Sequence, residues 1–231
     1  DLAAGKQTAN LTSKEALCHK VNAMLKHKEK GATIHTRSKE GEIELDPKRV
    51  FTIEDFYAIV HQRAPLLLSS SAGKKLDETR EFINYLTEKN IRVYGLTTGF
   101  GDLRECDVSA EQTALLSHNI ILSHNAGIGP MLSAEQVLGA MVLRANSLSK
   151  GNSGFQKRSL ETLIAMINHR IIPHIPQMGS LGASGDLALL AALGRAMQGS
   201  EDALVEYQGK EMTAKDALEA AGIFPFVPLA K

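Results

Sequence analysis

Helix-start signals recur along the chain and constrain its fold more than any other feature. A serine or threonine followed three residues later by a side chain that can bond back to it, ahead of apolar residues at helical spacing, is the capping box that opens an α-helix. Three such pairs occur: Thr52 with Asp55, Ser109 with Gln112, and Ser133 with Gln136. Apolar spacing predicts further helices over residues 13–28, 71–89, 155–170 and from 186 onward. The fold class is therefore expected to be mainly α.

Proline and weak strand signals separate the predicted helices. The helix that begins after Thr52 is expected to end before Ala64-Pro65, because the residue before a proline is pushed out of helical geometry. Residues 171–176 hold two prolines and are predicted to be extended, and a weak strand signal at 203–207 precedes a last helix capped by Thr213. We divide the chain into an N-terminal extension, residues 1–50, and one main domain, residues 51–231; within the extension, 31–47 is predicted to be an extended polar connection.

The charge balance and composition exclude several classes of partner. Lys and Arg together number 26, as do Asp and Glu, so no net field would recruit nucleic acid or anionic lipid. No run approaches the ~20 apolar residues that a membrane span requires, and no signal segment opens the sequence. The two cysteines, Cys18 and Cys106, make neither a disulfide framework nor a metal cluster. This composition suits a cytoplasmic protein.

A first glycine-rich loop occupies residues 93–101 and carries a tyrosine, Tyr94, among glycines and threonines. A dinucleotide-binding fingerprint is a poor match, because its third glycine would fall at Arg104. A phosphate-binding P-loop is also excluded, since no Gly-Lys-Ser/Thr follows. Taken alone, this loop leaves open whether Tyr94 has a chemical role or only packs.

A second glycine-rich loop, residues 179–187, places Ser184 between small residues just before a predicted helix. A helix N-terminus presents free N–H groups and a partial positive charge, so a serine there can cap the helix, help to bind an anion or act as a nucleophile. The nucleophile elbow of hydrolases is excluded, because it needs a glycine where Asp186 stands.

Four segments in register resolve these alternatives through a resemblance. The two glycine-rich loops, together with residues 123–129 (Ser-His-Asn-Ala-Gly-Ile-Gly) and 144–151 (Arg-Ala-Asn-Ser-Leu-Ser-Lys-Gly), resemble the aromatic amino-acid ammonia-lyase and aminomutase family. The similarity covers roughly residues 51–231. It implies the N-terminal, cofactor-bearing part of a helical fold of the fumarase/aspartase type.

The resemblance implies a cofactor built from the chain itself, 4-methylidene-imidazol-5-one (MIO), formed from Ala183, Ser184 and Gly185. The amide nitrogen of Gly185 would attack the Ala183 carbonyl, and loss of two waters would turn Ser184 into a dehydroalanine. Glycine lets the backbone fold back, and serine is a residue that can lose water in this way. Neither a metal nor a nucleotide is implied, and His118 and His124 do not share a helix face that could hold a metal.

The same resemblance implies roles for three more residues in ammonia elimination from an aromatic L-amino acid. Tyr94 would be the base that removes a β-proton; because a free phenol has a pKa of ~10, dipoles or hydrogen bonds would have to activate it. His124 would contact the substrate side chain, and Gly101 would allow close approach of the substrate or of Tyr94. The pair formed by Ser123 and His124 favours histidine, with urocanate as product. Tyrosine or phenylalanine as substrate is the alternative, although the pairs associated with those lyases are absent, and a 2,3-aminomutase would share the same residues.

Departures from the family pattern leave a non-catalytic alternative. Ser117 stands where the family often has glutamine, and Leu189 where it usually has proline. Family members are also far longer and assemble as tetramers with shared sites, so a homo-oligomer is expected. The resemblance implies that the family's other site residues lie in the part of the fold that follows Lys231. In a split protein, a companion C-terminal chain would carry them. The alternative is a truncated or split helical subunit without turnover of its own.

Overall fold

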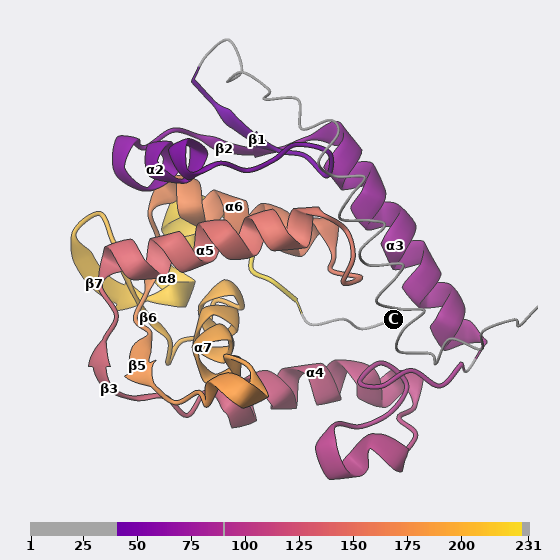
Figure 1. Ribbon diagram of the computed structural model, residues 1–231. Helices are drawn as coiled ribbons and strands as arrows, with labels where there is room; N and C mark the ends of the chain where they lie inside the picture. Colours follow the sequence, from indigo (N-terminus) through magenta and orange to yellow (C-terminus); the bar gives the residue numbers. More distant parts are fainter. Residues whose placement is uncertain (1–40, 90, 228–231) are drawn as a thin grey trace, which may run out of the picture. The chain divides into compact units, whose positions relative to one another are not determined.

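The computed structural model describes residues 41–89 and 91–227, which fall in a compact unit that begins at Arg37 (Figure 1). Its helices are α2 (Ile53–Gln62), α3 (Ser70–Glu88), α4 (Ala110–His124), α5 (Ala134–Ser149), α6 (Lys157–His169), α7 (Leu187–Met197) and α8 (Ala214–Ala221), with 3-10 turns η1 (Gly101–Glu105) and η2 (Gly182–Ser184). Its strands are β1 (Ile43–Leu45), β2 (Leu66–Leu68), β3 (Ile128–Met131), β4 (Ile172–Pro173), β5 (Pro176–Met178), β6 (Leu204–Tyr207) and β7 (Lys210–Thr213). The mainly α prediction is confirmed, whereas the helix predicted over 13–28 lies outside the described residues.

The predicted capping signals start helices at the predicted residues. Thr52 accepts a hydrogen bond from the Asp55 N–H at 3.2 Å, and the Asp55 carboxylate accepts one from the Thr52 N–H at 3.0 Å. The same reciprocal pair forms at Ser109 and at Ser133, and Thr213 caps α8 as expected. Each cap satisfies N–H groups that the first helical turn cannot bond internally, which explains why these starts are fixed locally.

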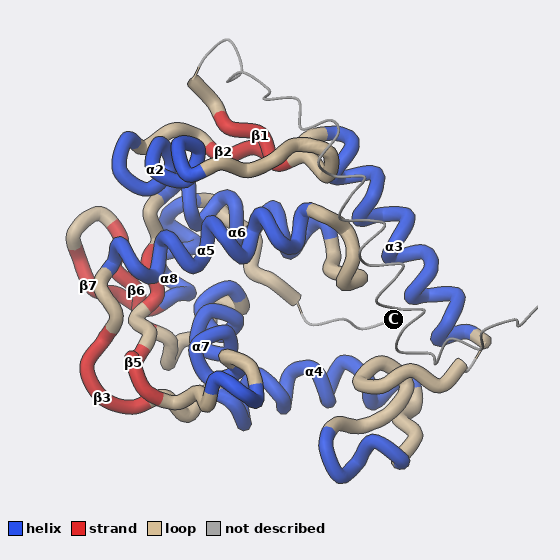
Figure 2. Tube along the Cα trace, in the orientation of Figure 1, coloured by secondary structure: helices blue, strands red, loops and turns tan. Residues whose placement is uncertain are grey.

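The core forms where α5 and α6 pack against each other, with α2 over α5 (Figures 1 and 2). Met141 and Ala145 of α5 and Leu160 and Met166 of α6 are fully buried. Burying one large apolar side chain contributes roughly 1.5–3 kcal/mol relative to leaving it exposed. This helical core supports the elements that carry the candidate site.

A short parallel pair of strands draws part of the predicted extension into that core. β1 pairs with β2 in parallel, and Ile43 and Leu45 are buried. The Ser69 N–H donates to the Leu45 carbonyl at 3.1 Å, which joins β1 to the start of α3. Residues 43–45 are therefore part of this unit, while a separate role for residues 1–50 as a whole stays a prediction.

Two antiparallel sheets flank the helices. β4 pairs with β6, which pairs with β7, and β3 pairs with β5. The extended segment predicted at 171–176 thus holds β4 and the start of β5, and the weak strand signal at 203–207 is β6. Val205 and Tyr207 point inward from β6 in the alternation of a half-buried strand. β3 and β5 matter most here, because the loop that follows β5 carries the candidate tripeptide.

The C-terminal end of α7 contains a buried cation. Arg195 is 8% exposed, and its guanidinium pairs with the Asp202 carboxylate. The Ser200 hydroxyl donates to the same carboxylate oxygen at 2.5 Å. The hydrogen bonds from Ser200 and Arg195 outweigh burial and hold the pKa of the Asp202 carboxyl below its ordinary value. This pair anchors the end of the helix whose start follows the tripeptide.

Asp202→Asn is expected to lower the free energy of unfolding at neutral pH by about 1 kcal/mol, because Arg195 loses its charged partner, although solvent at the exposed Asp202 side chain screens the pair. A lowered native pKa stabilises the fold above the unfolded pKa of about 3.9, and that stability is lost as the pH falls through the native value. Parent and variant should therefore converge in urea unfolding below about pH 4. Glu81→Gln, at an exposed position of α3, is the control with no such convergence. A gap between parent and Asp202→Asn that stays constant to lower pH contradicts the assignment.

Candidate active site

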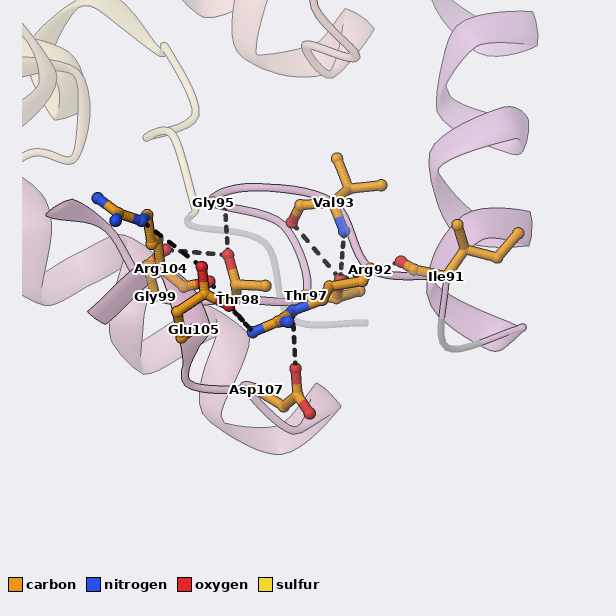
Figure 3. Close-up of polar contacts among 10 residues, drawn as sticks. All are labelled: Ile91, Arg92, Val93, Gly95, Thr97, Thr98, Gly99, Arg104, Glu105 and Asp107. Carbon is orange, nitrogen blue, oxygen red and sulfur yellow. Dashed lines mark hydrogen bonds and ion pairs between the residues drawn. The ribbon is translucent and has the colours of Figure 1, made fainter. Parts of the chain in front are cut away.

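Hydrogen bonds between threonine hydroxyls and the backbone hold the loop that carries Tyr94 (Figure 3). Thr97 Oγ1 accepts from the Val93 N–H at 2.8 Å and donates to the Ile91 carbonyl at 3.0 Å. Thr98 is 2% exposed, and its Oγ1 accepts from the Gly95 N–H at 3.2 Å. Because these bonds lie on both sides of Tyr94, they fix the backbone from which the ring projects.

The far side of the same loop is braced by one arginine. Arg92 forms ion pairs with Glu105 at 3.0 Å and with Asp107 at 3.5 Å, as Figure 3 shows. The Val108 N–H also donates to the Thr97 carbonyl at 2.9 Å. Each exposed ion pair contributes little by itself. Together, these contacts connect residues 105–108 to the backbone on both sides of Tyr94.

The Tyr94 side chain contacts two residues in the part of the chain that the structure describes. Its ring meets Phe100 edge-on at a centroid distance of 5.7 Å. Its phenol oxygen accepts a hydrogen bond from the Gly101 N–H at 3.2 Å, and the side chain is 62% exposed. This is the close approach expected of Gly101, while a catalytic role for either residue stays a prediction.

The tripeptide Ala183-Ser184-Gly185 lies in a tight turn ahead of α7. The Gly185 N–H donates to the Gly182 carbonyl at 3.3 Å, so the chain already folds back on itself there. Gly185 has φ +88°, in the region that favours glycine, and a Cβ at this position would meet nothing within 4 Å. A backbone nitrogen turned back along the chain, open space at Gly185 and a following helix start all fit the closure of an imidazolone ring.

His124 ends α4 with one ring nitrogen engaged. Nδ1 lies 2.9 Å from the Ile120 carbonyl oxygen and 3.0 Å from Ser123 Oγ. A carbonyl can only accept, so this geometry assigns the hydrogen of the neutral ring to Nδ1. Nε2 then carries a lone pair and can accept a hydrogen bond from a ligand. The half-buried His124 can therefore recognise a donor such as an imidazole N–H.

The backbone just after α4 contacts the backbone at the start of the tripeptide loop. A Cβ built on Gly179 would lie 2.8 Å from the Cα of Gly127, too close for any side chain. The structure thus brings the segment after His124 against the start of the tripeptide loop. The Tyr94 loop instead precedes α4 (Figure 1), and a helix of 15 residues is about 22 Å long. Within one chain, Tyr94 and the tripeptide lie toward opposite ends of this helix.

Several residues of the site region were not anticipated from the sequence. Phe100 packs on Tyr94, Arg92 braces its loop, and Ser180 accepts a hydrogen bond from Ala188 at 3.1 Å. Arg92 and Ser180 have partners more than five residues away, so no regular spacing marks them. Leu189, the departure noted in the first turn of α7, is partly buried and packs against the core.

Residues 41–89 and 91–227 contain no group of three His, Cys, Asp or Glu side chains placed to hold a metal ion. Among the same residues, no helix is both long enough and apolar enough to cross a bilayer.

The fold and the site define a mainly helical protein with a tight glycine-rich turn at a helix start and a loop tyrosine that accepts a hydrogen bond from a backbone N–H. The sequence pattern described as "Aromatic amino acid lyase" matches residues 51–231. The chain belongs to this family.

Individual relatives agree with this assignment. Over 180 residues the chain is 41% identical to a histidine ammonia-lyase of Alkaliphilus metalliredigens, covering 78% of this chain and 35% of that protein. Among solved structures, an ergothionase of Treponema denticola gives a TM-score of 0.76 at 28% identity, covering 80% of this chain and 36% of the other. A phenylalanine aminomutase of Pantoea agglomerans gives 0.75 at 27% identity, covering 82% and 36%. The chain thus spans about a third of the length of the relatives it matches.

Proposed function

We propose that the protein eliminates ammonia from an aromatic L-amino acid, with histidine as the preferred substrate and urocanate as product. The observation that carries this proposal is the turn at Ala183-Ser184-Gly185, with the Gly185 N–H folded back to Gly182 ahead of α7. Histidine is favoured because His124 offers an acceptor nitrogen to an imidazole and because histidine ammonia-lyases are among the relatives.

The cofactor expected from the tripeptide is MIO, which would supply an electron-poor alkene for the amino group. The start of α7 follows it directly, so the partial positive charge of the helix would stabilise negative charge that develops there. Tyr94 would take a β-proton at its phenol oxygen, which the hydrogen bond from the Gly101 N–H would hold in place. His124 would orient the substrate ring through Nε2.

The separation along α4 supports a site completed between copies of the protein. Tyr94 precedes the helix and the tripeptide lies near its other end, so one chain does not juxtapose them. We expect a homotetramer in the cytoplasm, and a companion C-terminal chain would supply the remaining site residues of a split protein. Native mass by light scattering, together with mass spectrometry of every chain in the preparation, tests this composition.

Two other functions share the described residues. An aminomutase would use the same loop and tripeptide, and a phenylalanine aminomutase is among the similar structures. A non-catalytic helical subunit is the second alternative, which the departures from the family pattern at Ser117 and Leu189 favour. Tyrosine or phenylalanine as lyase substrates differ from histidine only in the side-chain contact at His124.

Incubation of the protein, purified as its own cells make it, with L-histidine should release urocanate. His124→Phe is expected to raise KM for histidine by roughly 10–100-fold, because the acceptor for the imidazole N–H is lost. His169→Phe, at an exposed position on α6, is the matched control and should leave KM unchanged. Release of coumarate or cinnamate alone names another substrate, a β-amino acid product identifies an aminomutase, and absence of any product supports the subunit role.

A further inference from the structure

The loop that bears the tripeptide is closed at its base by one serine. Ser180 follows β5, and its Oγ accepts a hydrogen bond from the N–H of Ala188, in the first turn of α7, at 3.1 Å. The preceding residue, Gly179, also lies against Ala188, since a Cβ built on Gly179 would come within 3.0 Å of the Ala188 Cβ. Residues 181–187 therefore form a short loop whose two ends are held together.

This bond replaces an ordinary helix cap. Helices α2, α3, α4, α5 and α8 each begin at a serine or threonine in extended conformation, which accepts from the N–H three residues later. At α7 the N-cap residue Asp186 has φ −88° and ψ 54°, and its side chain makes no capping bond. The cap of α7 therefore comes from Ser180, eight residues upstream of the N–H that it accepts. A local cap fixes only a helix start, whereas this one also closes a loop.

Closure acts on the residues that must react. The turn within the loop already bonds the Gly185 N–H to the Gly182 carbonyl at 3.3 Å. Ring formation joins the Gly185 nitrogen to the Ala183 carbonyl carbon. The carbonyl oxygen leaves as water with the amide hydrogens of Ser184 and Gly185, and the Ser184 hydroxyl leaves as water with its α-hydrogen, without any redox change. Holding two reacting groups close raises their effective concentration, and a loop fixed at both ends spends less time extended.

We propose that Ser180 is a positioning residue for this ring closure: its bond to Ala188 holds the tripeptide in the compact turn from which Gly185 attacks Ala183. The inference rests on the proposed function, because it presumes that the tripeptide condenses. It adds a role for a residue outside the tripeptide and outside the substrate contacts. Leu181, next to Ser180, is 75% exposed, so core packing of that side chain does not hold the turn.

The test compares Ser180→Ala with Ser180→Thr, which keeps a hydroxyl acceptor, and with Ser133→Ala. Ser133 accepts the Gln136 N–H at 3.2 Å, so its removal costs α5 the same kind of bond far from the tripeptide. Each chain is made by cell-free synthesis, and the loss of two waters from the tripeptide peptide is followed by mass spectrometry over time. Urea unfolding of the same samples reports stability.

Ser180→Ala is expected to lose the two waters about five- to tenfold more slowly than the parent, the factor that corresponds to one cap bond. Ser180→Thr should restore most of the rate, and Ser133→Ala should condense at the parent rate despite a similar loss of stability. Condensation of Ser180→Ala at the parent rate, or equal slowing by Ser133→Ala, overturns the positioning role. A parent chain that never loses two waters overturns cofactor formation as well, so the two failures are distinguishable.

Discussion

Replacing Ser184 by alanine is expected to abolish the loss of two waters and to lower the rate of ammonia elimination by roughly a thousandfold or more. Alanine has no hydroxyl to leave, so the ring can gain no exocyclic alkene even if Gly185 attacks Ala183. Removing an electrophile that acts on the reacting bond costs about 4 kcal/mol or more of transition-state stabilisation. The loss should appear in kcat, because substrate binding groups such as His124 are untouched.

Intact mass and product release measure the two effects on one sample. Ser153→Ala, at an exposed position before α6, is the control and should keep both the two-water deficit and the elimination rate. Retention of most of the activity by Ser184→Ala would show that the tripeptide is not the electrophile.

Replacing Tyr94 by phenylalanine is expected to lower kcat/KM by about 10²–10⁴-fold, the usual contribution of a positioned base. Phenylalanine keeps the ring and its edge-on contact with Phe100 but removes the oxygen that accepts from Gly101. The tripeptide lies in another part of the fold, so the two-water deficit should persist in this variant. The combination of a normal mass deficit and slow elimination separates a base from a folding defect.

Tyr85→Phe is the matched control, because Tyr85 is a half-exposed tyrosine of α3 whose side chain makes no hydrogen bond to residues 41–89 or 91–227. Steady-state rates across a range of pH give a second readout. Loss of the base should remove the rise in rate that accompanies its deprotonation, whereas a structural change would scale the whole profile. Near-parent rates for Tyr94→Phe would exclude Tyr94 as the base.

Sequence patterns predicted the parts of this fold that depend on neighbours along the chain. Thr52 and Ser133 start their helices as expected, because a capping box is complete within four residues. The extended segment before β5 followed from its prolines in the same way. The hydrogen bond from Gly101 to Tyr94 was not predicted, because the family resemblance implied only that Gly101 allows close approach of the substrate or of Tyr94.

Contacts between distant segments could not be predicted from spacing. The parallel pairing of Ile43 with Leu66 joins strands on either side of α2, and no period links them. The bond from Ala188 to Ser180 was hidden for a related reason, since a serine eight residues before its donor matches no capping pattern. Such contacts depend on how the helices pack, which a single sequence does not express.

The close approach of Gly127 and Gly179 has a consequence for any attempt to redesign selectivity. Because neither residue has a side chain, the backbone at Gly127 contacts the backbone at Gly179 directly. A shift of one segment therefore displaces the other. A substitution that moves the imidazole of His124, at the end of α4, should therefore also move the residues that are proposed to condense. The proposed substrate contact and the proposed electrophile are thus connected through this one backbone contact. A substitution that changes which amino acid is bound should therefore also change the fraction of chains that lose two waters.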